Sequence, residues 1–183
     1  MSKKQKLHAL GTKIKKCQRC RLWKGAKHAV SGQGPGNAKI MMIGEAPGRL
    51  EDESGTPFVG PAGKFLDKTL DEFELKRRNI YITSVIKHRP PKNRDPRADE
   101  LAGCRVWWQE QIKIINPKLV FTLGRIAAKE VIGPGTLKGK LGKSVFQQGI
   151  HYLPTYHPAA AMRFPKINRV FQKTLKKIKN FAV

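Results

Sequence analysis

One glycine-rich stretch, residues 44–67 (GEAPGRLEDESGTPFVGPAGKFLD), constrains the fold of this chain more than any other feature. An apolar run, residues 38–43 (AKIMMI), precedes it and predicts a buried strand, while Phe65 and Leu66 begin an amphipathic helical pattern. A loop with five glycines and three prolines therefore leaves the carboxyl end of a strand, where doubly wound sheets bind ligands. Glu45 lies at this strand end, where an acidic side chain packs poorly against the core but is well placed to act on a bound ligand.

Further apolar runs alternate with helical patterns along the chain. This order is typical of an α/β protein whose parallel sheet is covered by helices on both faces. No internal repeat interrupts it, and a chain of 183 residues can bury one core without disulfides. We therefore expect a single domain over residues 1–183 whose later strands cover residues 80–85, 119–123, 144–146 and 150–153.

Charged residues mark three helices. Residues 1–16 hold six lysines and no acid, and we expect a helix to start within this segment, which is predicted to be partly frayed. Asp99 and Glu100 indicate the start of a second helix, because acids are favoured in the first turn. A strongly basic helix is predicted from about Asn168 to the end of the chain.

The net charge predicts a polyanionic partner. The 37 lysines and arginines outnumber the 13 aspartates and glutamates, which gives a formal net charge of +24. Soluble domains usually keep a net charge of about 2–8 in magnitude, so a solvated surface alone does not account for this excess. Nucleic acid is the partner that best fits this excess of positive charge. A membrane is the weaker alternative, because the sequence has no long apolar segment.

The chain has three cysteines, Cys17, Cys20 and Cys104. Since no secretion signal is visible, we expect a reducing compartment, the cytoplasm beside the nucleoid, where clustered cysteines indicate a metal before a disulfide. Cys17 and Cys20 are close enough in sequence to bind one metal together. Reduced, buried cysteines are the alternative. A fourth ligand would come from among His8, His28, His88, His151 and His157.

Motifs spread over nearly the whole chain resemble those of the family 4 (iron-sulfur) uracil-DNA glycosylases. They are residues 44–67, residues 81–96 (YITSVIKHRPPKNRDP), residues 156–160 (YHPAA) and the three cysteines. The resemblance implies a three-layer αβα sandwich around a short, mostly four-stranded parallel sheet. Two positions depart from the family, because Ser84 stands where the family has asparagine and His88 where it usually has cysteine.

The resemblance implies a 4Fe-4S cluster. Imidazole can replace thiolate on iron, but three cysteines and one histidine are also a common zinc set, so the ligand types alone leave zinc as the alternative. A histidine in place of a thiolate removes one negative charge and should raise the potential of the cluster. We expect a structural role for a cluster held by Cys17, Cys20, His88 and Cys104.

The resemblance also implies a base-binding pocket. Base release requires a flipped base, a tolerated positive charge on the sugar and a stabilised base anion. By resemblance, Phe58 stacks on the base, Glu45 orients a water and faces the sugar, and His157 donates to uracil O2, while Gly44 and Ala46 add backbone contacts. The structural alternatives are a core aromatic for Phe58, a capping or ion-paired acid for Glu45 and a packing role for His157.

Residues 159–165 (AAAMRFP) resemble the family loop that enters the minor groove and fills the space of the flipped base. Met162 is predicted to be the wedge, since proteins that distort DNA insert apolar side chains between base steps. Arg163 is predicted to contact a phosphate or the groove.

Ser84 leaves the base preference open. The family's asparagine presents an acceptor to N3–H and a donor to O4 of uracil, and cytosine presents the opposite pattern. A serine hydroxyl has one rotatable proton and can serve either pattern. The sequence therefore predicts a monomeric, monofunctional DNA glycosylase that acts on uracil-containing DNA and leaves an abasic site. The alternatives are a glycosylase for another deaminated base and a non-catalytic iron-sulfur protein that binds nucleic acid.

Overall fold

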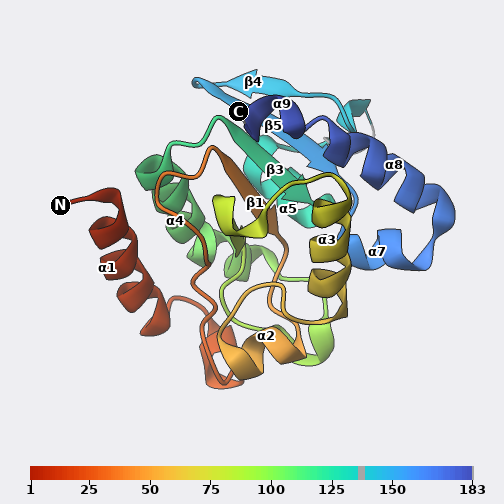
Figure 1. The fold of residues 1–183 in the computed structure, drawn as a ribbon. Helices are drawn as coiled ribbons and strands as arrows, with labels where there is room; N and C mark the ends of the chain where they lie inside the picture. Colours follow the sequence, from red (N-terminus) through yellow and green to blue (C-terminus); the bar gives the residue numbers. More distant parts are fainter. Residues whose placement is uncertain (136–138, 183) are drawn as a thin grey trace.

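The computed structural model describes residues 1–135 and 139–182 and places the strands of this part of the chain in one sheet, in the order β2-β1-β3-β5-β4 (Figure 1). β2, β1, β3 and β5 are parallel, and β4 pairs with β5 in the antiparallel direction at one edge. The predicted α/β fold with a mostly parallel sheet is confirmed. The strands are β1 (Ile40–Gly44), β2 (Ile80–Ser84), β3 (Leu119–Leu123), β4 (Val145–Gln147) and β5 (Ile150–Thr155).

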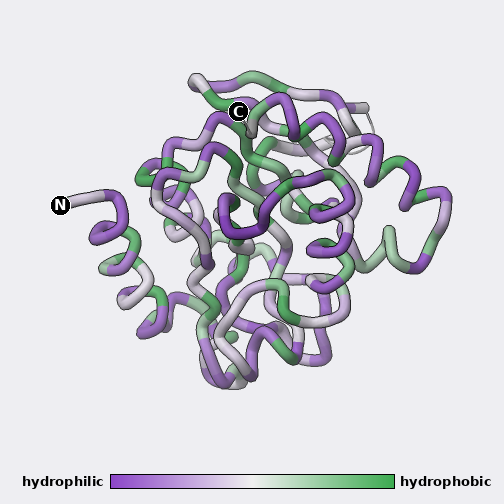
Figure 2. The backbone as a smooth tube through the Cα atoms, viewed as in Figure 1, coloured by the Kyte–Doolittle hydropathy of each residue, from purple (hydrophilic) through white to green (hydrophobic). Residues whose placement is uncertain are grey.

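Helices cover both faces of the sheet, because successive strand side chains point into two separate apolar layers. In β1, Met42 lies in one layer and Met41 in the other, and both are fully buried. Figure 2 shows apolar residues gathered along the central strands, while the outer helices alternate between polar and apolar residues. The covering helices are α3 (Pro61–Glu72) and α8 (Pro165–Lys176) on one face, and α4 (Ala98–Ile115) and α5 (Arg125–Ile132) on the other.

The N-terminal segment, predicted to be partly frayed, is helical from its third residue. Ser2 Oγ accepts from the Gln5 backbone N–H at 3.2 Å and Gln5 Oε1 accepts from the Ser2 backbone N–H at 2.8 Å, so a capping box fixes the first turn. Across the described residues, no helix has the length and apolar character needed to cross a membrane. The other helical segments are α1 (Lys3–Lys15), α2 (Arg49–Ser54), α7 (Pro158–Arg163), α9 (Lys179–Ala182) and the 3-10 turns η1 (Arg21–Lys24), η2 (Arg77–Asn79) and η3 (Pro91–Asn93).

The predicted strand boundaries agree with the structure to within two residues. β3 covers the predicted residues, and β2 ends one residue early, at Ser84. One helix was predicted from about Asn168 to the end of the chain. α8 instead begins at Pro165, because proline is favoured at the first helical position, and ends at Lys176, before the separate helix α9. The helix α2 was not predicted at all. Its six residues are mostly charged and show no apolar period, so the sequence pattern indicates no helix there.

Four strand ends meet at one edge of the sheet. Gly44 at the end of β1 is level with Ser84 at the end of β2, and Leu123 at the end of β3 is level with Thr155 at the end of β5. The chain passes from β1 to β2 on one side and then crosses to β3 on the other. β1 is therefore the switch point of the sheet, outside which α/β proteins bind ligands.

Candidate active site

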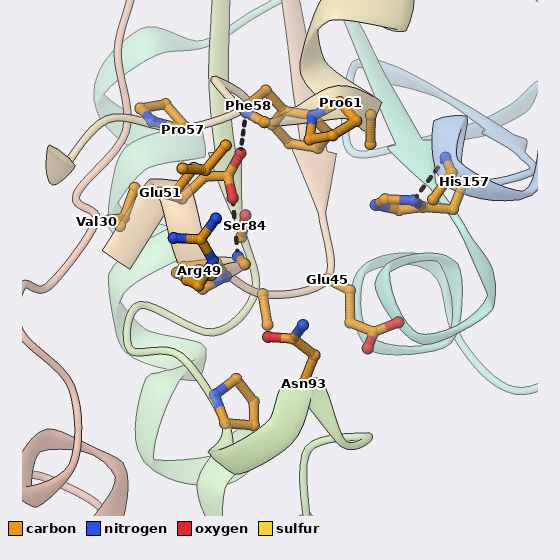
Figure 3. A pocket seen from close by; sticks show the side chains of 18 of the residues that line it. Val30, Glu45, Arg49, Glu51, Pro57, Phe58, Pro61, Ser84, Asn93 and His157 are labelled. Atoms are coloured by element: carbon orange, nitrogen blue, oxygen red, sulfur yellow. Dashed lines mark hydrogen bonds between the residues drawn. The ribbon is translucent and has the colours of Figure 1, made fainter. Parts of the chain in front are cut away.

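A cavity of about 520 Å³ opens at this edge of the sheet (Figure 3). Its size is within the range of about 300–1,000 Å³ that small-molecule pockets have. The loops that follow β1, β2 and β5 form its walls, although they are far apart in the sequence. Seven of the residues predicted for base binding, catalysis or DNA contact line it: Glu45, Ala46, Phe58, Ser84, His157, Met162 and Arg163.

Phe58 forms an apolar wall of the cavity. Its φ of 54° is unusual for a residue with a side chain. Its ring lies so close to Gly44 that a Cβ there would stand 2.5 Å from Phe58 Cζ, and a Cβ at Gly63 would overlap the Phe58 carbonyl. The His157 ring stacks against Phe58 with the ring centroids 6.0 Å apart and an interplanar angle of 28°. The two glycines therefore leave the space that fixes Phe58 over the cavity.

Glu51, which was not predicted, holds the glycine-rich loop closed around Phe58. Its Oε1 accepts from the backbone N–H groups of Val59 and Gly60 at 2.9 and 2.8 Å. Its Oε2 accepts from the backbone N–H of Gly48 at 3.1 Å, which completes a capping box at the start of α2. One carboxylate thus joins both ends of the loop (Figure 3). The sequence signal for this role of Glu51 was its position three residues after Gly48, where a glutamate can cap the start of a helix.

Glu45 directly follows β1 and points into the cavity (Figure 3). Its carboxylate has no hydrogen-bond partner among the described residues. Burial raises the pKa of Glu45, the Asp95 carboxylate raises it further, and the Arg125 guanidinium opposes both. A partly buried carboxylate without a partner is costly for folding, and such groups concentrate at functional sites.

His157 is the N-cap of α7, and its Nδ1 accepts a hydrogen bond from the Ala159 backbone N–H at 3.2 Å. Burial lowers the pKa of His157 to about 4, against a smaller opposite effect of the Glu51 carboxylate. The imidazole is therefore neutral near pH 7. Since Nδ1 is an acceptor in this bond, the proton of the neutral ring lies on Nε2. His157 thus offers one neutral N–H donor to the cavity.

Ser84 ends β2 at the cavity, and its hydroxyl makes no hydrogen bond to another described residue. Its carbonyl is held from behind by Lys87, whose Nζ donates to Ser84 O at 2.7 Å, to Thr83 Oγ1 at 2.7 Å and to Gln111 Oε1 at 2.9 Å. The Lys87 side chain is fully buried, and burial lowers its pKa to about 7. This network fixes the backbone of Ser84 and leaves its hydroxyl free for a ligand.

Met162 and Arg163 lie in α7 at the rim of the cavity. Met162 is 45% exposed and Phe164, the next apolar residue, is 55% exposed, which is unusual for large apolar side chains. α7 packs on α3, so the rim is carried by a helix anchored to the rest of the fold. Two large apolar side chains are thus exposed at the end of α7, and Phe164 was not among the predicted contacts.

The predicted metal ligands come from four segments: the end of α1, the start of η1, the loop after β2 and the helix α4. Cys17 follows the end of α1, and its Sγ accepts from Trp107 Nε1 at 3.2 Å. One turn earlier on α4, the Cys104 thiol lies against Cys20 and lowers the pKa of Cys20 to about 6, while the pKa of Cys104 is raised by the same contact. His88 is buried, and its Nδ1 has no hydrogen-bond partner among the described residues.

The predicted ligands supply thiol and imidazole groups, donor types that both iron and zinc bind. Within residues 1–135 and 139–182, no three His, Cys, Asp or Glu side chains are grouped closely enough to hold one metal ion. A cluster of several iron and sulfide ions is wider, so its ligands need only surround a common space. Cys17 and His88 line one hollow. The Cys20 and Cys104 thiols contact each other, and His88 Nδ1 has no partner among the described residues, so thiol and imidazole donors of the kind that iron binds are available.

Comparison with known proteins gives a consistent result over most of the chain. The family model described as the uracil DNA glycosylase superfamily matches residues 31–179. A type-4 uracil-DNA glycosylase of Saccharolobus solfataricus is 42% identical over 183 residues, covering 94% of this chain and 85% of the relative. Proteins of the same name are 39% identical in Sulfurisphaera tokodaii (97% of this chain, 85% of the relative) and 42% identical in Pyrobaculum aerophilum (93% and 90%).

Proposed function

The chain belongs to the uracil-DNA glycosylase superfamily, and on that premise we propose that it removes uracil from DNA as the first step of base excision repair. The reaction hydrolyses the N-glycosidic bond and leaves an abasic site. The observation that carries this function is that one cavity is lined together by an unpartnered carboxylate, an aromatic wall and a neutral imidazole donor. These are Glu45, Phe58 and His157, the groups that base release requires.

The geometry supports the following sequence of events. The flipped uracil stacks on Phe58, and the C1′–N1 bond breaks with its electron pair remaining on the base. His157 Nε2–H donates to O2 as negative charge develops there. Glu45 faces the positive sugar and orients a water, whose oxygen bonds to C1′ and whose proton passes to the carboxylate and then to solvent. The backbone of Ala46, which lines the cavity, and that of Gly44, at the end of β1, add contacts to the base.

The test is excision from single- and double-stranded oligonucleotides that contain uracil, hypoxanthine or xanthine, followed by alkali to cleave abasic sites. We expect uracil to be removed fastest. Ser84 is the observation that favours a second candidate, a glycosylase for another deaminated base, and a faster reaction with a purine would establish it. A protein that binds DNA and releases no base would instead be a non-catalytic binder. The monomeric state and the cytoplasmic location beside the nucleoid stay predictions.

For the cofactor, we propose a 4Fe-4S cluster held by Cys17, Cys20, His88 and Cys104. The relatives' type-4 name is consistent with such a cluster, and the contacts of the thiols with each other and with Trp107 support it. When bound, it would join the end of α1, the loop after β2 and α4 into one unit. Its role is structural, and no step of base release passes through it.

Protein purified without oxygen should be brown and contain iron and sulfide in equal amounts. His88→Cys should keep the cluster, whereas His88→Ala should make it labile, because one of four ligands is then missing. His28→Ala is the matched control, since His28 lines the same hollow but its Nδ1 is already paired with the Asp52 carbonyl at 2.7 Å. The measurements are the visible spectrum and the iron and sulfide contents. Colourless protein with stoichiometric zinc would contradict the cluster.

DNA binding should weaken steeply with salt, because each phosphate contact releases counterions with a slope of about −0.9 in log K against log salt. We propose that the DNA surface extends from Met162 and Arg163 onto α8, where Lys173 and Lys176 are exposed. Lys177 is also exposed, but its Nζ donates to the Gly142 carbonyl at 2.5 Å and so has a structural contact.

Replacing Lys173 and Lys176 with glutamine should therefore lower the magnitude of that slope by about 1–2. The matched control replaces Lys4 and Lys13, two exposed lysines of α1, which lies on the opposite side of the molecule from α7 and α8 (Figure 1). Binding is measured by fluorescence anisotropy at several salt concentrations. An unchanged slope in the α8 variant, or an equal change in the α1 variant, would place the DNA elsewhere.

A further inference from the structure

Ser84 alone offers too little to read a pyrimidine, but the cavity contains a second uncharged polar side chain. Asn93 is the one amide side chain among the described residues that line it, and it comes from the loop after β2 (Figure 3). The uracil edge presents an N–H donor at N3 beside an acceptor at O4. Reading both atoms requires an acceptor that faces N3–H and, beside it, a donor that faces O4. One hydroxyl cannot serve both atoms at once.

The turn that carries Asn93 is fixed at both ends. The Asn93 backbone N–H donates to the Pro90 carbonyl at 3.0 Å. Next along the chain, the Arg94 guanidinium pairs with both carboxylate oxygens of Glu100, at 2.7 and 2.8 Å, and the Glu100 side chain is fully buried. Lys92 and Asn93 have φ values of 53° and 54°, in the left-handed region that asparagine tolerates better than most residues. The backbone is thus held in a conformation that directs Asn93 into the cavity.

Arg89 fixes which way the Asn93 amide faces. Arg89 Nε donates to Asn93 Oδ1 at 2.7 Å. A guanidinium has only donors, so the oxygen of the amide must face it and the NH₂ group must face away. Asn93 Nδ2 has no acceptor among the described residues, and Figure 3 shows this amide directed at the cavity that Ser84 and Glu45 share. The cavity therefore contains a free hydroxyl and a free, oriented N–H donor.

We propose that Ser84 and Asn93 together read the base, with Arg89 as the positioning residue. Ser84 Oγ accepts from N3–H of uracil, and Asn93 Nδ2 donates to O4. Cytosine would place its N4 amino group against Asn93 Nδ2, donor against donor, and is rejected. The two side chains thus divide the task that the resemblance assigns to a single asparagine. This inference rests on the proposed removal of uracil.

The test compares single-turnover excision of uracil by the wild type and by variants at saturating enzyme. Asn93→Asp keeps the shape of the side chain but replaces the donor with an acceptor, and Asn93→Ala removes both. We expect uracil excision to fall by about tenfold or more in each, as for loss of a paired base contact. Lys92→Ala is the control, because Lys92 is exposed in the same turn and does not line the cavity. It should keep the wild-type rate.

A second variant pair separates base reading from structural damage. Ser84→Asn in the Asn93→Ala background should recover most of the lost rate, because one amide can then present both the acceptor and the donor. Arg89→Met leaves the Asn93 amide free to flip. The ratio of inhibition by free cytosine to inhibition by free uracil should therefore be higher for this variant than for the wild type. The melting temperature, measured for every variant, should stay within a few degrees of the wild type.

The outcomes distinguish this inference from the proposed function. An active wild type whose rate is unchanged by Asn93→Asp would overturn the role of Asn93 and leave uracil removal intact. Failure of Ser84→Asn to restore the Asn93→Ala variant would also overturn it. A wild type that removes no uracil would overturn both.

Discussion

Glu45→Gln is expected to lower uracil excision by about 10²-fold or more and, at the same time, to raise the free energy of unfolding. The rate falls because an amide neither balances the positive sugar nor accepts the proton of the attacking water, contributions typically of about 10²–10⁴-fold. The stability rises because burial, and then the Asp95 carboxylate, disfavour the charged form of Glu45, as its raised pKa indicates. If the role of Glu45 were only structural, its replacement would leave the excision rate unchanged and lower the free energy of unfolding.

The pH dependence of this stability difference follows from the sign of the shift. The pKa of Glu45 is higher in the folded protein than in the unfolded chain, so the wild type loses stability as pH rises above the unfolded value of about 4.3. Below that pH the carboxyl is protonated in both states. The stabilisation by Glu45→Gln should therefore be present at pH 7 and disappear near pH 4.

Single-turnover kinetics, DNA binding and urea unfolding at the two pH values test this expectation. Glu72→Gln is the matched control, since Glu72 is an exposed acid at the end of α3, and it should change none of the three. A Glu45→Gln variant that loses DNA affinity and rate equally would show a binding role. A variant that is less stable at pH 7 would show that the carboxylate is structural.

The layers of the fold could be predicted from the sequence, because they depend on apolar runs. The run at residues 119–123 predicts β3 without error, since its side chains are buried on both faces and Lys118 and Gly124 mark its two ends. The carboxyl-edge site follows from the same logic, because parallel strands bring the loops after β1, β2 and β5 to one edge. The roles of the residues gathered there stay predictions, but their gathering was implied by the order of strands and helices.

What the sequence did not reveal depends on polar contacts rather than on apolar pattern. Lys87 lies in a run that indicates a buried segment, yet a lysine is expected at the surface. It is fully buried because oxygens of Thr83, Ser84 and Gln111, which come from two separate elements, surround its ammonium group. Asn93 was missed because a left-handed backbone decides where its side chain points, and no periodicity records that conformation.

Replacing His157 is expected to have the other large effect on rate. His157→Ala removes the Nε2–H donor to uracil O2 and should lower excision by about 10²–10³-fold, as the loss of one preorganised donor to a developing anion does elsewhere. It also removes the N-cap of α7, which should cost about 1 kcal/mol of stability. His157→Asn separates the two effects, because asparagine caps a helix well but its shorter amide cannot replace the donor. We expect His157→Asn to keep most of the stability and to lose the rate.

The charge state of His157 allows a second test of this prediction, through the pH dependence of the excision rate and of stability. Its pKa of about 4 means that the ring stays neutral from pH 8 to pH 5, so the excision rate should show no inflection near pH 6.5 that depends on His157. Folding behaves differently. The unfolded chain takes up a proton near pH 6.5 and the folded protein only near pH 4, so the wild type should lose stability over this window as pH falls, and His157→Asn should not. A rate that falls with a pKa near 6.5 in the wild type and loses that inflection in His157→Asn would mean that the active donor is the imidazolium, and the neutral-donor mechanism would be wrong.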